Sequence, residues 1–143
     1  MAYPIESVGG LGPVLADRLR DAGVATTDEF LNRAGDAASR GILAAQTGID
    51  EGLVLHWARR CDLFRVHGIG RPMAALLEAA GIATVADLAA AEPEPLAMRL
   101  TGLNQDGAFC TVTPRERIVR EWVARAAGLR IVLDDRIGDA LRA

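Results

Sequence analysis

The side chains that could carry out catalysis are few and lie close together in the sequence. His56 and His67 are the two histidines of the chain, and Cys61 and Asp62 lie between them. A nucleophilic cysteine needs a base and a group that orients the base. Cys61 follows Trp57 by one turn of a predicted helix, on its apolar face, which favours a small core residue. We therefore expect no enzyme activity, no metal site and no cofactor.

Glycines at a fixed spacing are the second feature with chemical meaning. Residues 8–31 and 66–89 align without a gap at an offset of 58. The aligned glycines are Gly10, Gly12 and Gly23 with Gly68, Gly70 and Gly81. Glycine is favoured where the backbone needs a positive φ or a close approach. We expect a turn at each Gly-apolar-Gly, with backbone geometry that resists a Cβ atom at Gly12 and Gly70, and the apolar residue between the glycines in the core.

Each turn is expected to lead directly into a helix. Pro13 and Pro72 follow the turns, and proline is accommodated in the first turn of a helix, where its missing N–H costs nothing. Gly23 and Gly81 are expected to end these helices. Threonine and acidic residues then begin a second short helix in each copy. The sequence therefore predicts an all-α fold.

This arrangement resembles the helix-hairpin-helix motif in its tandem form, in which two copies pack about a pseudo-twofold axis. Over nearly its full length the chain also resembles domain-of-unknown-function family 4332. The residues that carry this second resemblance are a Tyr-Pro-Ile-Glu start at 3–6, Trp57 before Asp62, and a late helix with Pro114 and Trp122. The helix-hairpin-helix resemblance implies non-specific binding of a nucleic-acid backbone.

In helix-hairpin-helix proteins, backbone N–H groups at the turn and at the start of the next helix point at a phosphate. Carried over to this chain, the donors are Gly10 and Gly12 in the first copy and Gly68, Gly70 and Arg71 in the second. The alternative is that each turn only joins two packed helices, because a shared fold does not fix a function.

The charge distribution disfavours a nucleic-acid partner. The net charge is −3, and all 16 basic residues are arginine. Nucleic-acid-binding proteins concentrate positive charge on the binding face, yet acidic residues outnumber basic ones in both glycine repeats. Val14 and Pro72 occupy the position after the turn that is often lysine in DNA-binding members of the class.

A second DNA-binding pattern lies between the two copies. Residues 43–57 match the spacing of a helix-turn-helix, but the start of its recognition helix would present Asp50, Glu51 and Gly52. Acidic side chains there would face phosphates, and few side chains could read a base edge. We interpret this region as a connector instead.

The helix expected at residues 71–80 is apolar almost all round, whereas its counterpart in the first copy has a charged outer face. A helix of this kind is covered on every side. Either the C-terminal residues cover it within one chain, or another protein or a second copy does. In the second case the interaction face comprises Met73, Ala75, Leu76 and Ala79.

We predict a tandem helix-hairpin-helix domain over residues 1–92 and a helical C-terminal extension over 93–143. The domain contains repeats at 5–33 and 63–91, with connector helices at 34–62. A proline-rich break is expected after residue 91. Within the extension, Thr113 and Glu116 predict a capping box, and residues 134–143 are expected to form an amphipathic tail helix.

These observations predict a non-catalytic module that mediates protein–protein interaction or self-association. The alternative is sequence-independent binding of a DNA backbone through the two turns. The two cysteines are far apart, and no apolar segment resembles a signal peptide or could span a membrane. We therefore expect a cytoplasmic protein with no membrane partner. The lysine-free, alanine-rich composition is typical of a GC-rich, bacterial-like coding sequence.

Overall fold

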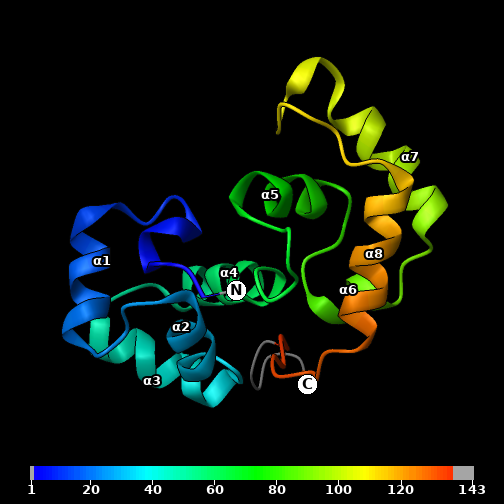
Figure 1. Ribbon diagram of the computed structural model, residues 1–143. Coiled ribbons are helices and arrows are strands. Elements are labelled where there is room, and N and C mark those ends of the chain that lie inside the picture. The colour runs from blue at the N-terminus through cyan, green and yellow to red at the C-terminus, as the bar shows by residue number, and fades with distance from the viewer. Residues whose placement is uncertain (1, 137–143) are drawn as a thin grey trace. The chain divides into compact units, whose positions relative to one another are not determined.

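The computed structural model describes residues 2–136, and its regular structure is helical, as predicted (Figure 1). The elements are η1 (Ile5–Val8), α1 (Gly12–Asp21), α2 (Thr27–Arg33), α3 (Ala37–Thr47), α4 (Glu51–Leu63), α5 (Arg71–Ala79), α6 (Val85–Ala89), α7 (Pro93–Leu103), η2 (Gln105–Gly107) and α8 (Glu116–Ala127). The described residues form two compact units. Unit 1 comprises residues 2–62 and 132–136, and unit 2 comprises residues 63–131.

The ends of α1 and α5 are closed in the same way, 58 residues apart. Gly23 follows α1 with a φ of 88°, and the N–H of Val24 donates to the oxygen of Leu19 at 2.8 Å. Gly81 follows α5 with a φ of 89° and is flanked by the equivalent hydrogen bonds. In each copy the glycine N–H also donates to the oxygen three residues earlier, at 2.9 Å for Gly23 and 3.0 Å for Gly81. The two bonds satisfy carbonyl groups that the last helical turn leaves without partners. Both glycines end helices, as predicted.

The starts of α2 and α6 also match. Thr26 precedes α2 and Thr84 precedes α6, and each hydroxyl accepts a hydrogen bond from the backbone N–H three residues later. Glu29 and Asp87 occupy those later positions, and their carboxylates accept in return from the threonine N–H. These capping boxes fix where both short helices begin.

The core of unit 1 is mainly aliphatic and includes an edge-to-face aromatic pair. Ile5, Leu19 and Leu43 are fully buried. The rings of Phe30 and Trp57 meet edge to face, with centroids 6.4 Å apart and an interplanar angle of 71°. Edge-to-face packing at this distance is a favoured geometry for aromatic pairs. This pair places α4 next to α2 within the unit.

Residues 132–136 return to unit 1 after the last helix. The N–H of Asp134 donates to the oxygen of Gly35 at 2.8 Å. Arg40, in α3, is buried and donates to the backbone oxygens of Ala34, Asp134 and Arg136 at 2.8–3.0 Å. A buried guanidinium is tolerated when its donors are satisfied. Arg40 therefore fastens this segment to α3.

In unit 2, α8 packs against both α6 and α7, and α5 packs against α7 (Figure 1). The buried face of α8 includes Val119, Trp122 and Ala126, which recur at helical spacing. The proline-rich segment expected to be a break forms the first turn of α7, because Pro93 and Pro95 stand where proline is compatible with a helix.

The capping box predicted at Thr113 and Glu116 is absent. Helix α8 begins at Glu116, and Arg115 precedes it without a side-chain cap, so Glu116 is the first helical residue and not the third. The Thr113 hydroxyl lies outside the helix and accepts a hydrogen bond from Asn104. Residues 134–136 are not helical, and the rest of the expected tail helix lies outside the described residues. The division into a tandem helix-hairpin-helix domain over residues 1–92 and an extension over 93–143 stays a prediction.

Candidate functional site: two glycine turns and a fastened loop

The first glycine turn precedes α1. Gly10 and Gly12 both have a φ of 75°, and both are exposed. Leu11, between them, is buried, so the apolar residue fills the core beneath the turn as predicted. Arg60 of α4 donates to the oxygen of Val8, just before the turn, at 3.1 Å. The turn is thus anchored from below by Leu11 and from one side by α4.

The second glycine turn precedes α5 and differs from the first at one position. Gly68 has a φ of 96° and Ile69 is fully buried, which matches Gly10 and Leu11. Gly70, however, has a φ of −105° and a ψ of −166°, and a Cβ atom placed there would meet nothing within 4 Å. Extended backbone of this kind is open to any residue. The prediction that Gly70 resists a Cβ atom is therefore wrong, whereas Gly12 has the predicted geometry.

Backbone donors are unoccupied at the second turn. In the described part of the chain, the N–H groups of Gly68, Gly70 and Arg71 donate to no protein acceptor. Ile69, between them, donates to the oxygen of Val66 at 3.1 Å. The Arg71 side chain is exposed at the start of α5. The N–H groups named from the sequence are therefore not used within the described chain, and their binding of a phosphate stays a prediction.

Helix α8 supplies two residues at the second turn that the sequence reasoning missed. Arg125 donates to the oxygen of His67 at 3.0 Å. Trp122, one turn earlier, brings its Nε1 within 3.1 Å of the position that a Cβ atom on Gly68 would occupy. A signal was present in the sequence, because Trp57 and Arg60 of α4 have the same spacing as Trp122 and Arg125.

The proposed interaction face on α5 is only partly accessible. Leu76 is fully buried, Met73 and Ala75 are half-buried, and Ala79 is exposed. Helix α7 packs against α5, and the Sδ of Met73 lies 3.6 Å from the Sγ of Cys110. Leu76 therefore cannot contact a partner in this structure.

A loop after α7, comprising residues 105–113, is fastened by one buried side chain. Asn104 is 4% exposed, and its Nδ2 donates to the oxygen of Cys110 at 3.0 Å and to Oγ1 of Thr113 at 2.8 Å. Its Oδ1 accepts from the N–H groups of Phe109, at 2.8 Å, and Cys110, at 3.0 Å. We call residues 105–113 the fastened loop. One amide thus fixes the backbone at Phe109 and Cys110 and holds the hydroxyl of Thr113.

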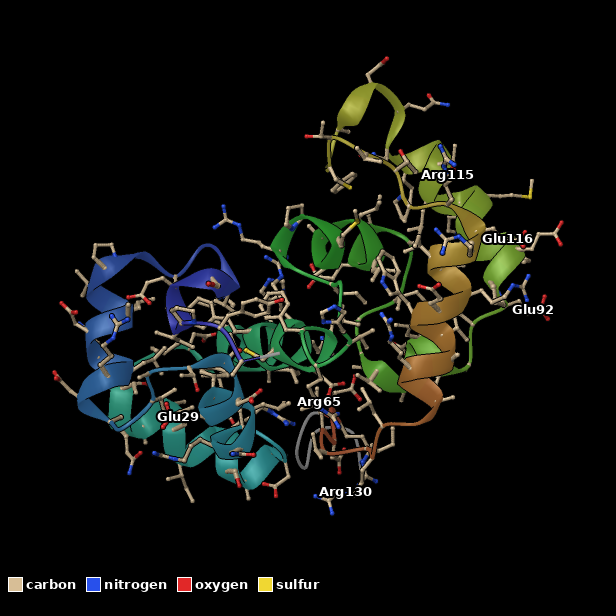
Figure 2. The ribbon with its side chains drawn as sticks, viewed as in Figure 1. Glu29, Arg65, Glu92, Arg115, Glu116 and Arg130 are labelled. Carbon is tan, nitrogen blue, oxygen red and sulfur yellow. The ribbon has the colours of Figure 1, made fainter. Side chains whose placement is uncertain are left out.

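Most of the arginines are already bound within their own unit. For example, the Arg65 guanidinium donates to the backbone oxygen of Arg130 at 2.7 Å. Both residues are labelled in Figure 2. The arginines that donate to oxygens of their own unit are Arg20, Arg33, Arg40, Arg59, Arg60, Arg65, Arg99, Arg117, Arg120, Arg125 and Arg136. Arg71 has no such acceptor among the described residues. Positive charge is therefore used largely to hold backbone oxygens and nearby carboxylates.

Comparison with known families gives one match. Residues 9–129 match the family model described as a domain of unknown function, DUF4332. The chain belongs to the DUF4332 family. No curated protein and no solved structure matches it. The match covers both glycine turns and the fastened loop, so these features all lie within the family's domain.

The cysteine and the histidines first considered for catalysis in this DUF4332 protein differ in exposure. Cys61 is buried, and burial raises the pKa of its thiol, which keeps the sulfur protonated and unreactive. His56 and His67 are exposed on α4 and on the second turn. Within residues 2–136 no three His, Cys, Asp or Glu side chains group as metal ligands, and no helix is long and apolar enough to cross a membrane. Absence of enzyme activity stays a prediction.

Proposed function

We propose that this DUF4332 protein is a non-catalytic helix-hairpin-helix module that recognises another protein. The helix-hairpin-helix assignment is supported by the two glycine turns, each with a buried aliphatic residue between its glycines and a helix directly after it. The choice of a protein partner is carried by the fastened loop.

The fastened loop presents apolar side chains from a fixed backbone. Phe109 is 37% exposed and Val112 is 72% exposed, while Asp106 is the one charged residue among residues 105–113. Compact loops whose ends are held together frequently carry function. A loop that is ordered before binding loses little conformational entropy in the complex, so exposed apolar area there contributes more fully to affinity.

The charge of the chain favours a protein over a nucleic acid. A nucleic-acid backbone is held by several cationic side chains that displace its counterions. Most arginines here donate to oxygens of their own unit, and the net charge is −3. A surface with few unengaged cations and an ordered apolar loop suits a protein partner better than a polyanion.

The test removes the apolar side chains and keeps the fastening residue. Phe109→Ser with Val112→Ser should leave the chain folded and lower the melting temperature modestly, because Val112 is mostly exposed and only part of Phe109 is buried. Sedimentation velocity measures self-association, and quantitative affinity purification from the source cells measures a different partner. We expect a complex that the wild type forms and the double variant loses. Ile42→Ser, at an exposed site on α3, is the matched control and should keep the complex. A double variant that keeps every complex contradicts the proposal.

A second candidate function is sequence-independent binding of a DNA backbone. The observation that favours it is the set of unoccupied N–H groups at Gly68 and Gly70 beside the exposed Arg71. Binding of this kind must weaken steeply as salt rises, and Arg71→Glu should weaken it most. A gel-shift series with duplex and single-stranded DNA at low and moderate salt tests it. Binding that survives moderate salt or ignores Arg71 excludes this mode.

A further inference from the structure

We propose that the second glycine turn binds a carboxylate, with the indole N–H of Trp122 as one of its donors. The inference rests on the proposed function, because the carboxylate would belong to the protein partner. The second glycine turn is separate from the fastened loop, so this inference gives it a role of its own. It also predicts that the partner carries a carboxylate, which can be tested before the partner is identified.

Trp122 is a buried side chain whose polar edge faces the turn. Its side chain is 3% exposed. Nε1 is its nearest atom to the Cβ position of Gly68, at 3.1 Å, while Cδ1 is 4.0 Å away. No buried side-chain nitrogen or oxygen in the described chain lacks a partner. Since Nε1 donates to no described residue, this atom must remain in contact with solvent. Indole nitrogen is a donor only, so it is available to a ligand oxygen.

Backbone donors surround the same turn. The N–H groups of Gly68, Gly70 and Arg71 donate to no acceptor in the described chain. The last of these belongs to the first turn of α5, where the aligned peptide dipoles give a partial positive charge. Arg71 adds a guanidinium, which pairs with a carboxylate through parallel hydrogen bonds. Neutral donors and one cation are the usual elements of a carboxylate site.

The first turn also has backbone N–H groups without an acceptor in the described chain, at Gly10 and Gly12, but it lacks the indole and the arginine and so serves as a comparison. A Cβ atom on Gly10 would meet no side chain within 4 Å, so no indole covers it. The position equivalent to Arg71 is Pro13. The indole and the arginine therefore distinguish the second turn from the first.

One unengaged guanidinium favours a single carboxylate over a nucleic acid. A nucleic-acid strand carries a phosphate at every nucleotide and requires several cations along its path. At the second turn the Arg125 guanidinium already donates to the backbone oxygen of His67. The Arg71 guanidinium is therefore the one that can bind a ligand. An acidic side chain or a C-terminal carboxylate carries one charge that matches this arrangement.

Sodium acetate titrations of isotope-labelled protein, with chloride matched, test the site by NMR. We expect a saturating shift of the Trp122 indole N–H signal and of the Gly68 and Gly70 amide signals. The signals of the Trp57 indole N–H and the Gly10 amide should not shift with acetate concentration. Trp57→Phe assigns the two indole signals. Arg71→Gln should weaken acetate binding by about tenfold, as expected for loss of a charged hydrogen-bond partner.

Three outcomes would overturn the proposal. The first is no saturating shift at Trp122, and the second is an equal shift at Gly10. The third is binding of inorganic phosphate or a short DNA oligonucleotide at least tenfold tighter than acetate, which would assign the donors to a phosphate. Trp122→Phe removes the donor but keeps an aromatic ring, so weaker binding with an unchanged melting temperature supports the indole's role. The acetate result does not depend on the fastened loop. If acetate binds but the Phe109 and Val112 substitutions do not affect the complex, the carboxylate site is supported. The fastened loop is then not the contact with the partner.

Discussion

Arg99 donates a hydrogen bond to the backbone oxygen of Ala80, 2.8 Å away, and so satisfies a carbonyl at the end of α5. Arg33 makes the same contact with Ala22 at the end of α1, at 2.9 Å. The two alanines are equivalent by the offset of 58, but the arginines come from α2 in unit 1 and from α7 in unit 2. The two copies therefore close equivalent helix ends with side chains from non-equivalent elements.

Replacing either arginine should destabilise the protein. Arg33→Met and Arg99→Met each leave a partly buried carbonyl without its donor, and we expect a loss of about 1–2 kcal/mol in the free energy of unfolding. Urea denaturation measures it. Arg117→Met is the control, because Arg117 forms an exposed pair with Glu121 in α8, and such pairs contribute about 0.5 kcal/mol or less. Equal losses of stability at all three sites would contradict the prediction that the two carbonyl contacts contribute more than an exposed ion pair.

The two turn glycines should respond differently to alanine. Gly12→Ala places a Cβ atom on backbone with a φ of 75°, which costs about 1–2 kcal/mol. Gly70→Ala should cost less, about 0.5–1 kcal/mol, which is the difference between glycine and alanine at a helix N-cap, because the backbone is extended and the space is open. Thermal melts should separate the variants by about 2–4 °C for each kcal/mol. A larger loss for Gly70→Ala would contradict this assignment.

Asn104→Ala should release the fastened loop. The substitution removes four hydrogen bonds from a buried position, and we expect a loss of about 2–4 kcal/mol in the free energy of unfolding. Hydrogen exchange should accelerate at the Phe109 and Cys110 amides before it does in α8. Gln105→Ala, at the exposed neighbouring position, is the control and should leave both measurements near the wild-type values. Unchanged exchange at Phe109 would contradict the role of Asn104.

The cap of α3 should make stability depend on pH. Asp36 accepts a hydrogen bond from the N–H of Ser39 at 2.8 Å, and this bond is the main cause that lowers the pKa of Asp36 below its ordinary value of 3.8. A carboxyl with a lowered pKa in the folded state stabilises the protein above its unfolded-state pKa. That stabilisation is lost as the pH falls through the folded-state pKa.

Asp36→Asn separates the charge from the cap, since asparagine also caps helices. The urea midpoint of the wild type should exceed that of Asp36→Asn near neutral pH. The gap should close as the pH is lowered below about 3.8, the ordinary value for aspartate. A gap that stays constant over this range would show that the Asp36 charge does not contribute.

The sequence was sufficient where the interactions are local. Gly23 and Gly81 end helices through hydrogen bonds to residues of the preceding turn, and Leu11 and Ile69 are buried between their glycines. All these features follow from residue type and short spacing. The capping box predicted at Thr113 was wrong. A threonine hydroxyl can cap the following helix or bond to another element, and local spacing does not distinguish the two. In the fold Asn104 donates to the Thr113 hydroxyl.

The equivalence of Gly12 and Gly70 in the alignment did not extend to their backbones. Gly12 is the first residue of α1 and Gly70 is the residue before α5, yet one has a φ of 75° and the other a φ of −105°. An aligned residue type indicates which conformations are accessible, and the packing of the surrounding elements selects among them. The accessible face of α5 is a second case, since the pattern left open whether the chain itself covers Leu76, and it is buried.

The sequence by itself determined the all-α class, the register of the two copies and the turns that begin α1 and α5, because periodicity, glycine and helix capping act over a few residues. Only the tertiary structure decided which distant side chains complete those turns. Trp122 lies 54 residues after Gly68, and Arg99 lies 19 residues after Ala80. Such contacts depend on how α7 and α8 pack in unit 2. A local pattern does not specify that packing, because many helix arrangements bury the same apolar faces.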